Sequence, residues 1–239
     1  MDDFIGALPK VELHLHLEGS LRPATMLALA ERHGVDLGAA TAEELEAQSR
    51  FESFDDFLSL FLKGLHVLRG AGDFVDATVA LASELSSQNV RYAEVTTTAY
   101  SHHQRGVPIG DYIEGIDEGR RLARVDHGVE IGWVCDIPRE MEPPELEYTA
   151  DLITGGSGPQ GVVALGLGGP EPGFPPEQFT ASFAKAKAAG LGSVPHAGET
   201  EGPASVWGAI RALAADRVGH GIRALEDPVL IDHLAGNDI

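Results

Sequence analysis

The segment VELHLHL at residues 11–17 decides the fold class, because its alternation of apolar and polar side chains is the pattern of a β-strand. Five further segments are predicted to be strands: residues 90–98 (VRYAEVTTT), 129–137 (VEIGWVCDI), 162–167 (VVALGL), 192–196 (GSVPH) and 217–220 (RVGH). Longer stretches with helical spacing lie between them. Strands that alternate with helices indicate βαβ units and a parallel sheet.

Helices are expected at residues 23–33, 74–86, 112–125, 143–153, 177–189, 204–215 and 228–234. A further helix should begin at Ser53, and one of its faces is strongly apolar: Phe54, Phe57, Leu58, Phe61, Leu62 and Leu65. Six βα units in 239 residues fit either a doubly wound sheet or most of an eight-stranded barrel. Because there is no repeat, low-complexity tract or linker, we expect one domain over residues 1–239.

The charge balance is strongly acidic, with 37 Asp and Glu against 17 Lys and Arg and a formal net charge of −20. Such a chain repels phosphate backbones and anionic lipid, so we expect neither nucleic acid nor membrane as a partner. The single cysteine, Cys135, excludes an internal disulfide framework. The N-terminus does not resemble a signal peptide, and the expected location is cytoplasmic. The oligomeric state stays open.

Two histidines on the first strand, His14 and His16, are separated by one residue. Residues i and i+2 of a strand point to the same side, so two imidazoles at this spacing could bind one metal ion. The alternative is a solvated polar face. We prefer the metal site because the other face of the strand is apolar, which would turn the histidines inward in a barrel.

Two more histidines end predicted strands. His196 is followed by a glycine turn and Glu199, and His220 lies between two glycines. The ends of parallel strands are where α/β proteins build their active sites. Histidine ligands favour zinc over magnesium or calcium, and a nearby glutamate can act as an acid or base. The residues therefore predict metal-assisted hydrolysis, without naming the bond that is cleaved.

These segments resemble the adenosine deaminase family over nearly the whole chain. PKVELHLHLEGSLRP (9–23) resembles its first strand, VRYAEV (90–95) its second, SVPHAGE (193–199) its fifth and RVGHG (217–221) its sixth. The resemblance implies a (β/α)8 TIM-barrel domain, present in this chain as about six βα units. It also implies zinc-dependent hydrolytic deamination of adenosine or a related 6-aminopurine nucleoside, giving the 6-oxo product and ammonia.

By that resemblance, His14, His16 and His196 would bind one Zn²⁺ per chain. Glu199 would protonate the purine N1, which makes C6 more electrophilic. His220 would orient the zinc-bound hydroxide and shuttle its proton. These two residues would be the catalytic acid and base.

The resemblance also implies substrate contacts. His16 would lie against the substrate as well as the metal, Glu18 would face the sugar, and the backbone N–H of Gly169 would meet the purine N3. The carboxylate of Glu18 argues against a phosphorylated sugar, through charge repulsion. The expected partner is a small purine nucleoside.

Members of the family extend past the position of Ile239, where this chain ends. The resemblance implies two further βα units with paired aspartates, one of which would complete the zinc sphere; Asp238 lies before them and is not a substitute. At about 30 residues per βα unit, roughly 60 residues would be needed. We therefore expect a barrel truncated before its last two strands, of uncertain stability and activity.

The substrate is the second open point. GLGGPE (166–171), CDIP (135–138) and PHAGET (195–200) are closer to the bacterial branch that contains aminodeoxyfutalosine deaminases of menaquinone synthesis. A different class of function is a non-catalytic zinc- or purine-binding fragment. A third is a barrel hydrolase with the same metal site and another leaving group. A cytidine-deaminase type of site is excluded, because it needs two or three cysteines.

Overall fold

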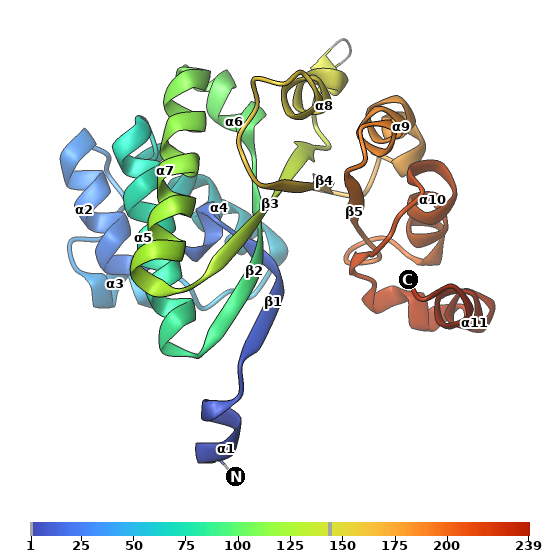
Figure 1. Ribbon diagram of the computed structural model, residues 1–239, viewed down its shortest axis with the longest axis horizontal. Coiled ribbons are helices and arrows are strands. Elements are labelled where there is room, and N and C mark those ends of the chain that lie inside the picture. The colour runs from blue at the N-terminus through green and yellow to red at the C-terminus, as the bar shows by residue number, and fades with distance from the viewer. Residues whose placement is uncertain (1, 143–144) are drawn as a thin grey trace. The chain divides into compact units, whose positions relative to one another are not determined.

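The computed structural model describes residues 2–142 and 145–239. All six expected strands are present there, each within two residues of its predicted bounds: β1 (Lys10–His16), β2 (Val90–Thr97), β3 (Glu130–Pro138), β4 (Val162–Gly168), β5 (Gly192–Ala197) and β6 (Gly219–His220). Figure 1 shows helices between successive strands. The strand order in the sheet follows the chain from β1 to β6, without the reversal of a doubly wound sheet.

The helices of the described part are α1 (Asp2–Ala7), α2 (Pro23–His33), α3 (Ala42–Ala47), α4 (Phe54–Val67), α5 (Ala71–Ser87), α6 (Ala99–Gln104), α7 (Ile109–His127), α8 (Tyr148–Thr154), α9 (Thr180–Ala188), α10 (Pro203–Leu213) and α11 (Pro228–Asn237). Short 3₁₀ turns accompany them: η1 (Glu18–Ser20), η2 (Glu145–Glu147), η3 (Pro176–Phe179) and η4 (Ile222–Glu226). None of these helices is both long enough and apolar enough to span a bilayer.

Helices α1, α3 and α6 were not expected, because each has only six residues. A local signal did exist for α3. The Thr41 side chain accepts a hydrogen bond from the Glu44 backbone N–H, and the Glu44 carboxylate accepts one from the Ala40 N–H, which is a capping pattern. Of the helix predicted at 143–153, residues 143 and 144 lie outside the described part, and the rest forms η2 and α8.

The contacts within the chain define two compact units. Unit 1 contains the residues up to Thr97 together with Ser101–Gly132, and unit 2 contains Thr98–Tyr100 together with Trp133–Ile239. In unit 1, β1 pairs with β2 in parallel, and α5 lies beside α7 (Figure 1).

Glycines bring α5 and α7 unusually close. A Cβ atom at Gly115 would lie 2.5 Å from the Ala71 carbonyl oxygen, and one at Gly119 would lie 2.6 Å from the Thr78 Cβ. Gly115 and Gly119 are four residues apart, so they lie on one face of α7. This face is where α5 packs, and a larger side chain would push the two helices apart.

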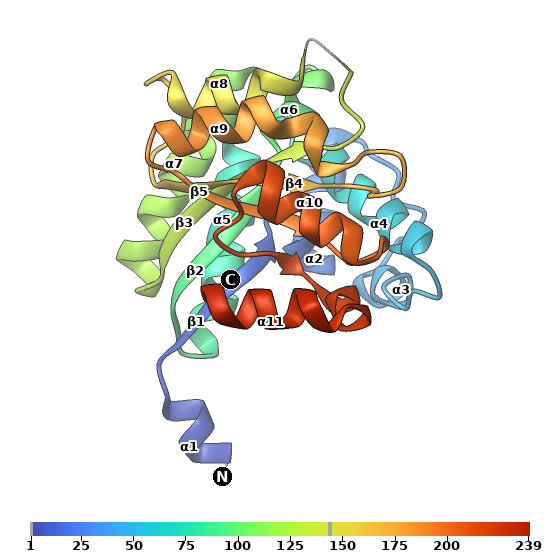
Figure 2. The same ribbon diagram turned by 90° about the vertical axis from the view of Figure 1, so that its right-hand side faces the viewer.

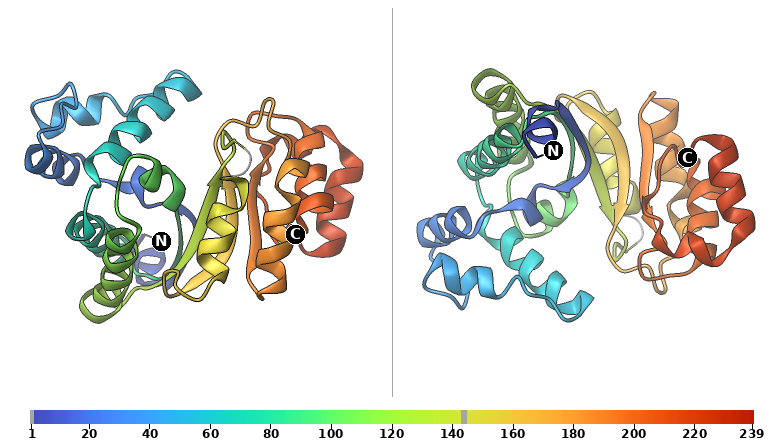
Figure 3. Two further views of the ribbon diagram at one scale, coloured as in Figure 1. Left: turned by 90° about the horizontal axis from the view of Figure 1, so that it is seen from above. Right: turned by 90° about the horizontal axis from the view of Figure 1, so that it is seen from below.

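In unit 2, the strands β3, β4, β5 and β6 pair in parallel in chain order. Helices α9, α10 and α11 lie together on one side of β5, as Figures 2 and 3 show. A core of apolar side chains fills the space between strands and helices: Ile137, Leu165, Leu167, Phe179, Phe183 and Leu213 are all buried. This packing fixes the carboxyl ends of the strands, where the predicted site residues lie.

Candidate active site

The strand β1 of unit 1 carries His14 and His16 near its carboxyl end. Their ring centroids are 5.8 Å apart, with the ring planes tilted by 49°. The two imidazoles therefore lie beside one another, as the i, i+2 spacing predicts. His14 is exposed and His16 is half-buried.

Glu18 lies in the 3₁₀ turn that directly follows β1, and it is buried. Its Oε1 accepts hydrogen bonds from Thr97 Oγ1 and from His102 Nε2, both at 2.9 Å. Thr97 ends β2, and His102 belongs to α6. The carboxylate is therefore held on two sides, which fixes where its second oxygen points.

His102 was not predicted as a site residue, and its protonation follows from its partners. Arg105 can only donate, so its hydrogen bond of 2.8 Å to His102 Nδ1 leaves the ring hydrogen on Nε2, which donates to Glu18. Burial lowers the pKa of His102, although the hydrogen bond and charge of Glu18 oppose this shift. Burial also lowers the pKa of Arg105, to about 10, so its guanidinium stays charged at neutral pH.

In unit 2, His196 lies on β5 and is buried. Its Nδ1 is 2.9 Å from the Leu167 carbonyl oxygen, which can only accept. Nδ1 therefore carries the hydrogen, and Nε2 is the nitrogen with the lone pair. A backbone carbonyl on the far ring nitrogen is the usual companion of a metal-ligating histidine.

Arg139 holds the backbone at the same place. It is fully buried, and it donates to the His196 carbonyl oxygen at 2.6 Å and to the Phe174 carbonyl oxygen at 2.5 Å. Burial lowers the pKa of Arg139, while the charges of Glu171 and Asp136 raise it. Sequence reasoning missed this residue, because its role depends on a contact with a residue 57 positions away.

The turn after His196 is held by a second buried residue, Glu171. Its carboxylate accepts the backbone N–H groups of Gly198 at 2.9 Å and of Glu199 and Thr200 at 2.8 Å, and the hydroxyl of Ser205. Burial raises the pKa of Glu171, but these hydrogen bonds outweigh it and leave the pKa below its usual value. Glu171 thus stays ionised and fixes the turn that carries Glu199.

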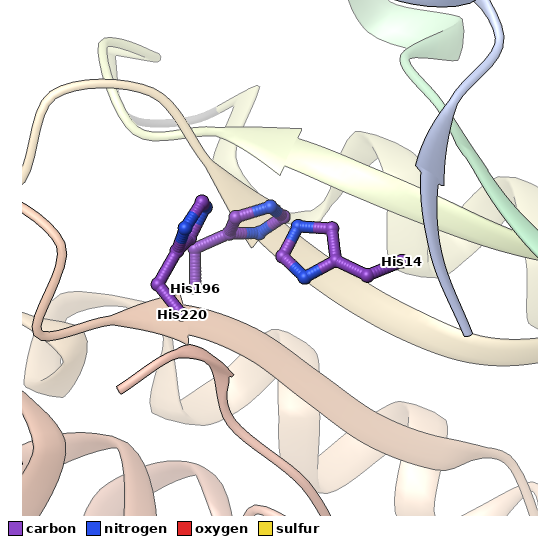
Figure 4. Close-up of side chains that lie close together, drawn as sticks. All are labelled: His14, His196 and His220. Carbon is purple, nitrogen blue, oxygen red and sulfur yellow. The ribbon is translucent and has the colours of Figure 1, made fainter. Parts of the chain in front are cut away.

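The turn brings Glu199 to His220. The Glu199 Oε2 lies 3.4 Å from His220 Nε2, and the ring centroids of His196 and His220 are 5.1 Å apart. Figure 4 shows these two rings next to each other. His220 adopts a left-handed backbone with φ of 63°, a strained conformation for a residue with a side chain. Burial lowers the pKa of His220, and the charge of Glu171 partly opposes this.

Gly169 follows β4 directly and is exposed, with φ of 92°. Only glycine adopts that conformation without strain, so a side chain is disfavoured there. Its backbone is therefore accessible at the carboxyl end of the strand. That position is compatible with the expected contact to a ligand.

The family model for adenosine deaminase matches residues 9–239. The chain belongs to the adenosine deaminase family. This membership confirms the resemblance found in the sequence and places the chain among hydrolases that act on C–N bonds.

Within the adenosine deaminase family, two kinds of curated relative are similar to the chain. Aminodeoxyfutalosine deaminase from Streptomyces avermitilis is 40% identical over 240 residues, which span 100% of this chain and 67% of the relative. Adenine deaminase from Bordetella avium is 38% identical over 239 residues, spanning 100% of this chain and 75% of the relative. For the aminodeoxyfutalosine deaminase of Streptomyces coelicolor, the match covers 60% of the relative.

Two solved structures of deaminase type are also similar. Adenine deaminase from Arthrobacter aurescens has a TM-score of 0.91 and 31% identity, covering 98% of this chain and 71% of that one. An amidohydrolase from Burkholderia ambifaria with bound Zn has a TM-score of 0.88 and 29% identity, covering 99% of this chain and 65% of that one. The fold is therefore the expected α/β fold of TIM-barrel type, represented by six βα units.

Proposed function

We propose that the protein catalyses zinc-dependent hydrolytic deamination of a 6-aminopurine to the 6-oxo product and ammonia. The observation that carries this proposal is the turn held by Glu171, which sets Glu199 beside His220 and next to His196. An acid, a base and a metal-type histidine at adjacent strand ends are the parts that hydrolysis at an aromatic carbon needs.

As the family resemblance implies, His14, His16 and His196 would be the zinc ligands. The donor chemistry fits, because these side chains are all nitrogen donors and His196 presents the tautomer of a ligand. When bound, zinc would lower the pKa of a water and so supply a nucleophile near neutral pH.

The chain's own residues would move the protons. Glu199 would donate to the purine N1, which draws electron density from C6. His220, whose pKa is lowered by burial, is neutral at pH 7 and can accept a proton from the attacking water. Gly169 would offer its backbone N–H to N3, and Glu18, fixed by His102 and Thr97, would face the substrate beyond the purine.

The substrate belongs to one of three classes: adenosine, free adenine or aminodeoxyfutalosine. The relatives are named for two of these substrates. The reaction would be the same for all three, and only the substituent on the purine would differ. An alternative of another class is a zinc- and purine-binding protein without turnover. The chain spans 60% to 75% of the length of the curated relatives.

The test is ammonia release from adenine, adenosine and aminodeoxyfutalosine by zinc-loaded protein. Glu199→Gln should lower turnover by at least about 100-fold, the contribution of one general acid. Glu201→Gln is the matched control, because it removes the same charge two residues further along. Zinc binding with no ammonia from any substrate would refute the proposed function and support the binding alternative.

A further inference from the structure

One cavity of unit 1 has a basic wall that the proposed deamination does not use. Its volume is about 430 Å³, and it lies between the end of α4 and the residues that precede α7. It is lined by His66, Leu68, Arg69, Arg105, Gly106 and Val107. Among these described residues, three are basic and none is acidic. In a chain with a net charge of −20, such a grouping is a local exception.

The Arg105 guanidinium is held by neighbours that do not neutralise it. Its Nη2 donates to the Leu68 carbonyl oxygen at 3.4 Å and to His102 Nδ1 at 2.8 Å. Its Nε and Nη1 are buried, and neither has a hydrogen-bond partner among the described residues. The Glu18 carboxylate is bonded to the other ring nitrogen of His102, Nε2. Arg105 therefore carries its positive charge without a direct contact to a carboxylate.

A second guanidinium, that of Arg69, lies close enough to act on the first. Burial lowers the pKa of Arg105 most, the charge of Glu18 raises it, and the charge of Arg69 lowers it further. Arg69 is exposed, and it donates from Nε to the His66 carbonyl oxygen at 3.0 Å and from Nη1 to the His33 carbonyl oxygen at 3.5 Å. Neither arginine has an ion pair within the described part of the chain. An anion beside them would offset their mutual repulsion.

The local charge, and not the net charge of the chain, decides which ligand the cavity attracts. At physiological ionic strength the Debye length is about 8 Å, so exposed carboxylates beyond that distance are largely screened. The Asp111 carboxylate lies near Gly70 but is not part of the lining. Glu18 offsets part of the charge of Arg105, which leaves that of Arg69. The cavity is therefore positive and attracts an anion.

The donor groups favour phosphate among anions. A guanidinium presents its N–H groups in a planar fork that matches two phosphate oxygens. The Nη2 of Arg69 donates to no described residue, so both of its hydrogens are available to a ligand. His66 uses Nδ1 for the Leu62 carbonyl oxygen at 2.6 Å, which leaves Nε2 for a ligand. Small-molecule sites have volumes of about 300–1,000 Å³, so this cavity can also accept a small organic group attached to the phosphate.

We propose that the cavity lined by His66, Arg69 and Arg105 binds a phosphate group, either as inorganic phosphate or on a small phosphate monoester. Arg69 would donate hydrogen bonds to the phosphate oxygens, and the anion would balance the charge of Arg105. The site does not depend on the proposed function, because it lies on the Nδ1 side of His102, whereas Glu18 is bonded to Nε2.

The experiment is a calorimetric titration of the protein with inorganic phosphate, at an ionic strength held constant with sodium chloride. We expect saturable binding with a Kd of about 1 mM or tighter, because charge-assisted hydrogen bonds to a guanidinium are strong. Glycerol 3-phosphate is the monoester probe, and glycerol is its phosphate-free control. Tighter binding of glycerol 3-phosphate than of phosphate would identify a monoester as the ligand, and weaker binding would identify free phosphate. Saturation by neither probe would overturn the proposal.

Three substitutions test the role of the arginine fork. Arg69→Gln should weaken phosphate binding by about 10-fold or more. Arg50→Gln is the matched control, because Arg50 is an exposed arginine outside the lining, and its Kd should equal that of the wild type. Arg69→Lys keeps the charge but loses the fork, so its Kd should lie between those of wild type and Arg69→Gln. An equal loss in Arg69→Gln and Arg50→Gln would refute the site, since only the net charge would then matter.

Two further measurements separate this site from the proposed zinc. Phosphate oxygens also bind metal ions, so the titration is repeated after chelator treatment, and the Kd should not change. Binding that is lost with the metal and retained in Arg69→Gln would place the phosphate on the metal and overturn the proposal. Amide hydrogen exchange should slow at residues 66–69 and 105–107 when phosphate is bound. Because none of these readouts uses turnover, a failure of the proposed deamination would leave their result unchanged.

Discussion

The carboxylate of Glu171 organises the turn that carries the proposed acid, and Glu171→Gln tests this. The amide keeps one accepting oxygen, but its NH₂ group meets N–H and O–H donors on the other side: Gly198 N–H at 2.9 Å and the hydroxyl of Ser205. A hydrogen bond to a charged group contributes about 1.5–3 kcal/mol, and a buried donor left unpaired costs about 1–3 kcal/mol. We therefore expect the free energy of unfolding to fall by about 3 kcal/mol.

Urea denaturation of zinc-free protein at pH 7 measures this loss without a contribution from the metal. The control is Glu177→Gln, which removes the same charge from an exposed position six residues away. Its effect should stay within about 0.5 kcal/mol. A loss in Glu171→Gln no larger than in the control would refute the claim that Glu171 holds the turn.

The pH dependence of the stability provides an independent check that Glu171 stabilises the fold in its ionised form. Because the folded pKa of Glu171 lies below its ordinary value of 4.5, its stabilisation is fully present above that value. It is lost as the pH falls through the lowered folded pKa. The difference in stability between wild type and Glu171→Gln should therefore narrow below pH 4.5 and stay constant above it. A difference that grows on acidification would contradict the assignment.

Three further changes have defined outcomes. Gly119→Ala should lower the free energy of unfolding by about 1–3 kcal/mol, because the added Cβ would clash with Thr78. The control is Gly110→Ala on the same helix: its Cβ would have no atom within 4 Å, so the change should be neutral or slightly stabilising. His102→Leu should cost about 1.5–3 kcal/mol in urea unfolding, because it removes a hydrogen bond to the buried Glu18 carboxylate. Zinc added to chelator-treated protein at 100 times its Kd should raise the free energy of unfolding by about 2.7 kcal/mol, and no thermal shift would count against a zinc site.

The strands and the strand-end residues were predictable because their signals are local. Alternation located β1 and the His14–His16 pair, and His220 was expected at the end of a strand, where the structure has it at the end of β6. The apolar face of β1 was predicted less well: Val11 and Leu13 are exposed, at 65% and 39%. Alternation establishes which side chains share a face, but not what covers that face.

The residues that hold the site were not predictable in the same way. Arg139 acts on a carbonyl 57 residues away, and His102 acts on a carboxylate 84 residues away. Glu171 ends the GLGGPE segment that contains Gly169, yet nothing local shows that its partners are backbone N–H groups 27 to 29 residues later. Such roles depend on contacts in the folded protein, and no spacing of residues in the sequence marks a charged side chain that will be buried.

These buried charges explain how an acidic chain can present a defined site. With a net charge of −20, mobile carboxylates would repel one another and spread the turns that carry them. Glu171 instead accepts backbone N–H groups, and Glu18 accepts Thr97 and His102, so each is fixed by donors that carry no full positive charge. Two guanidinium groups act on the neighbours of these carboxylates. That of Arg139 donates to a carbonyl oxygen of β5, and that of Arg105 donates to His102.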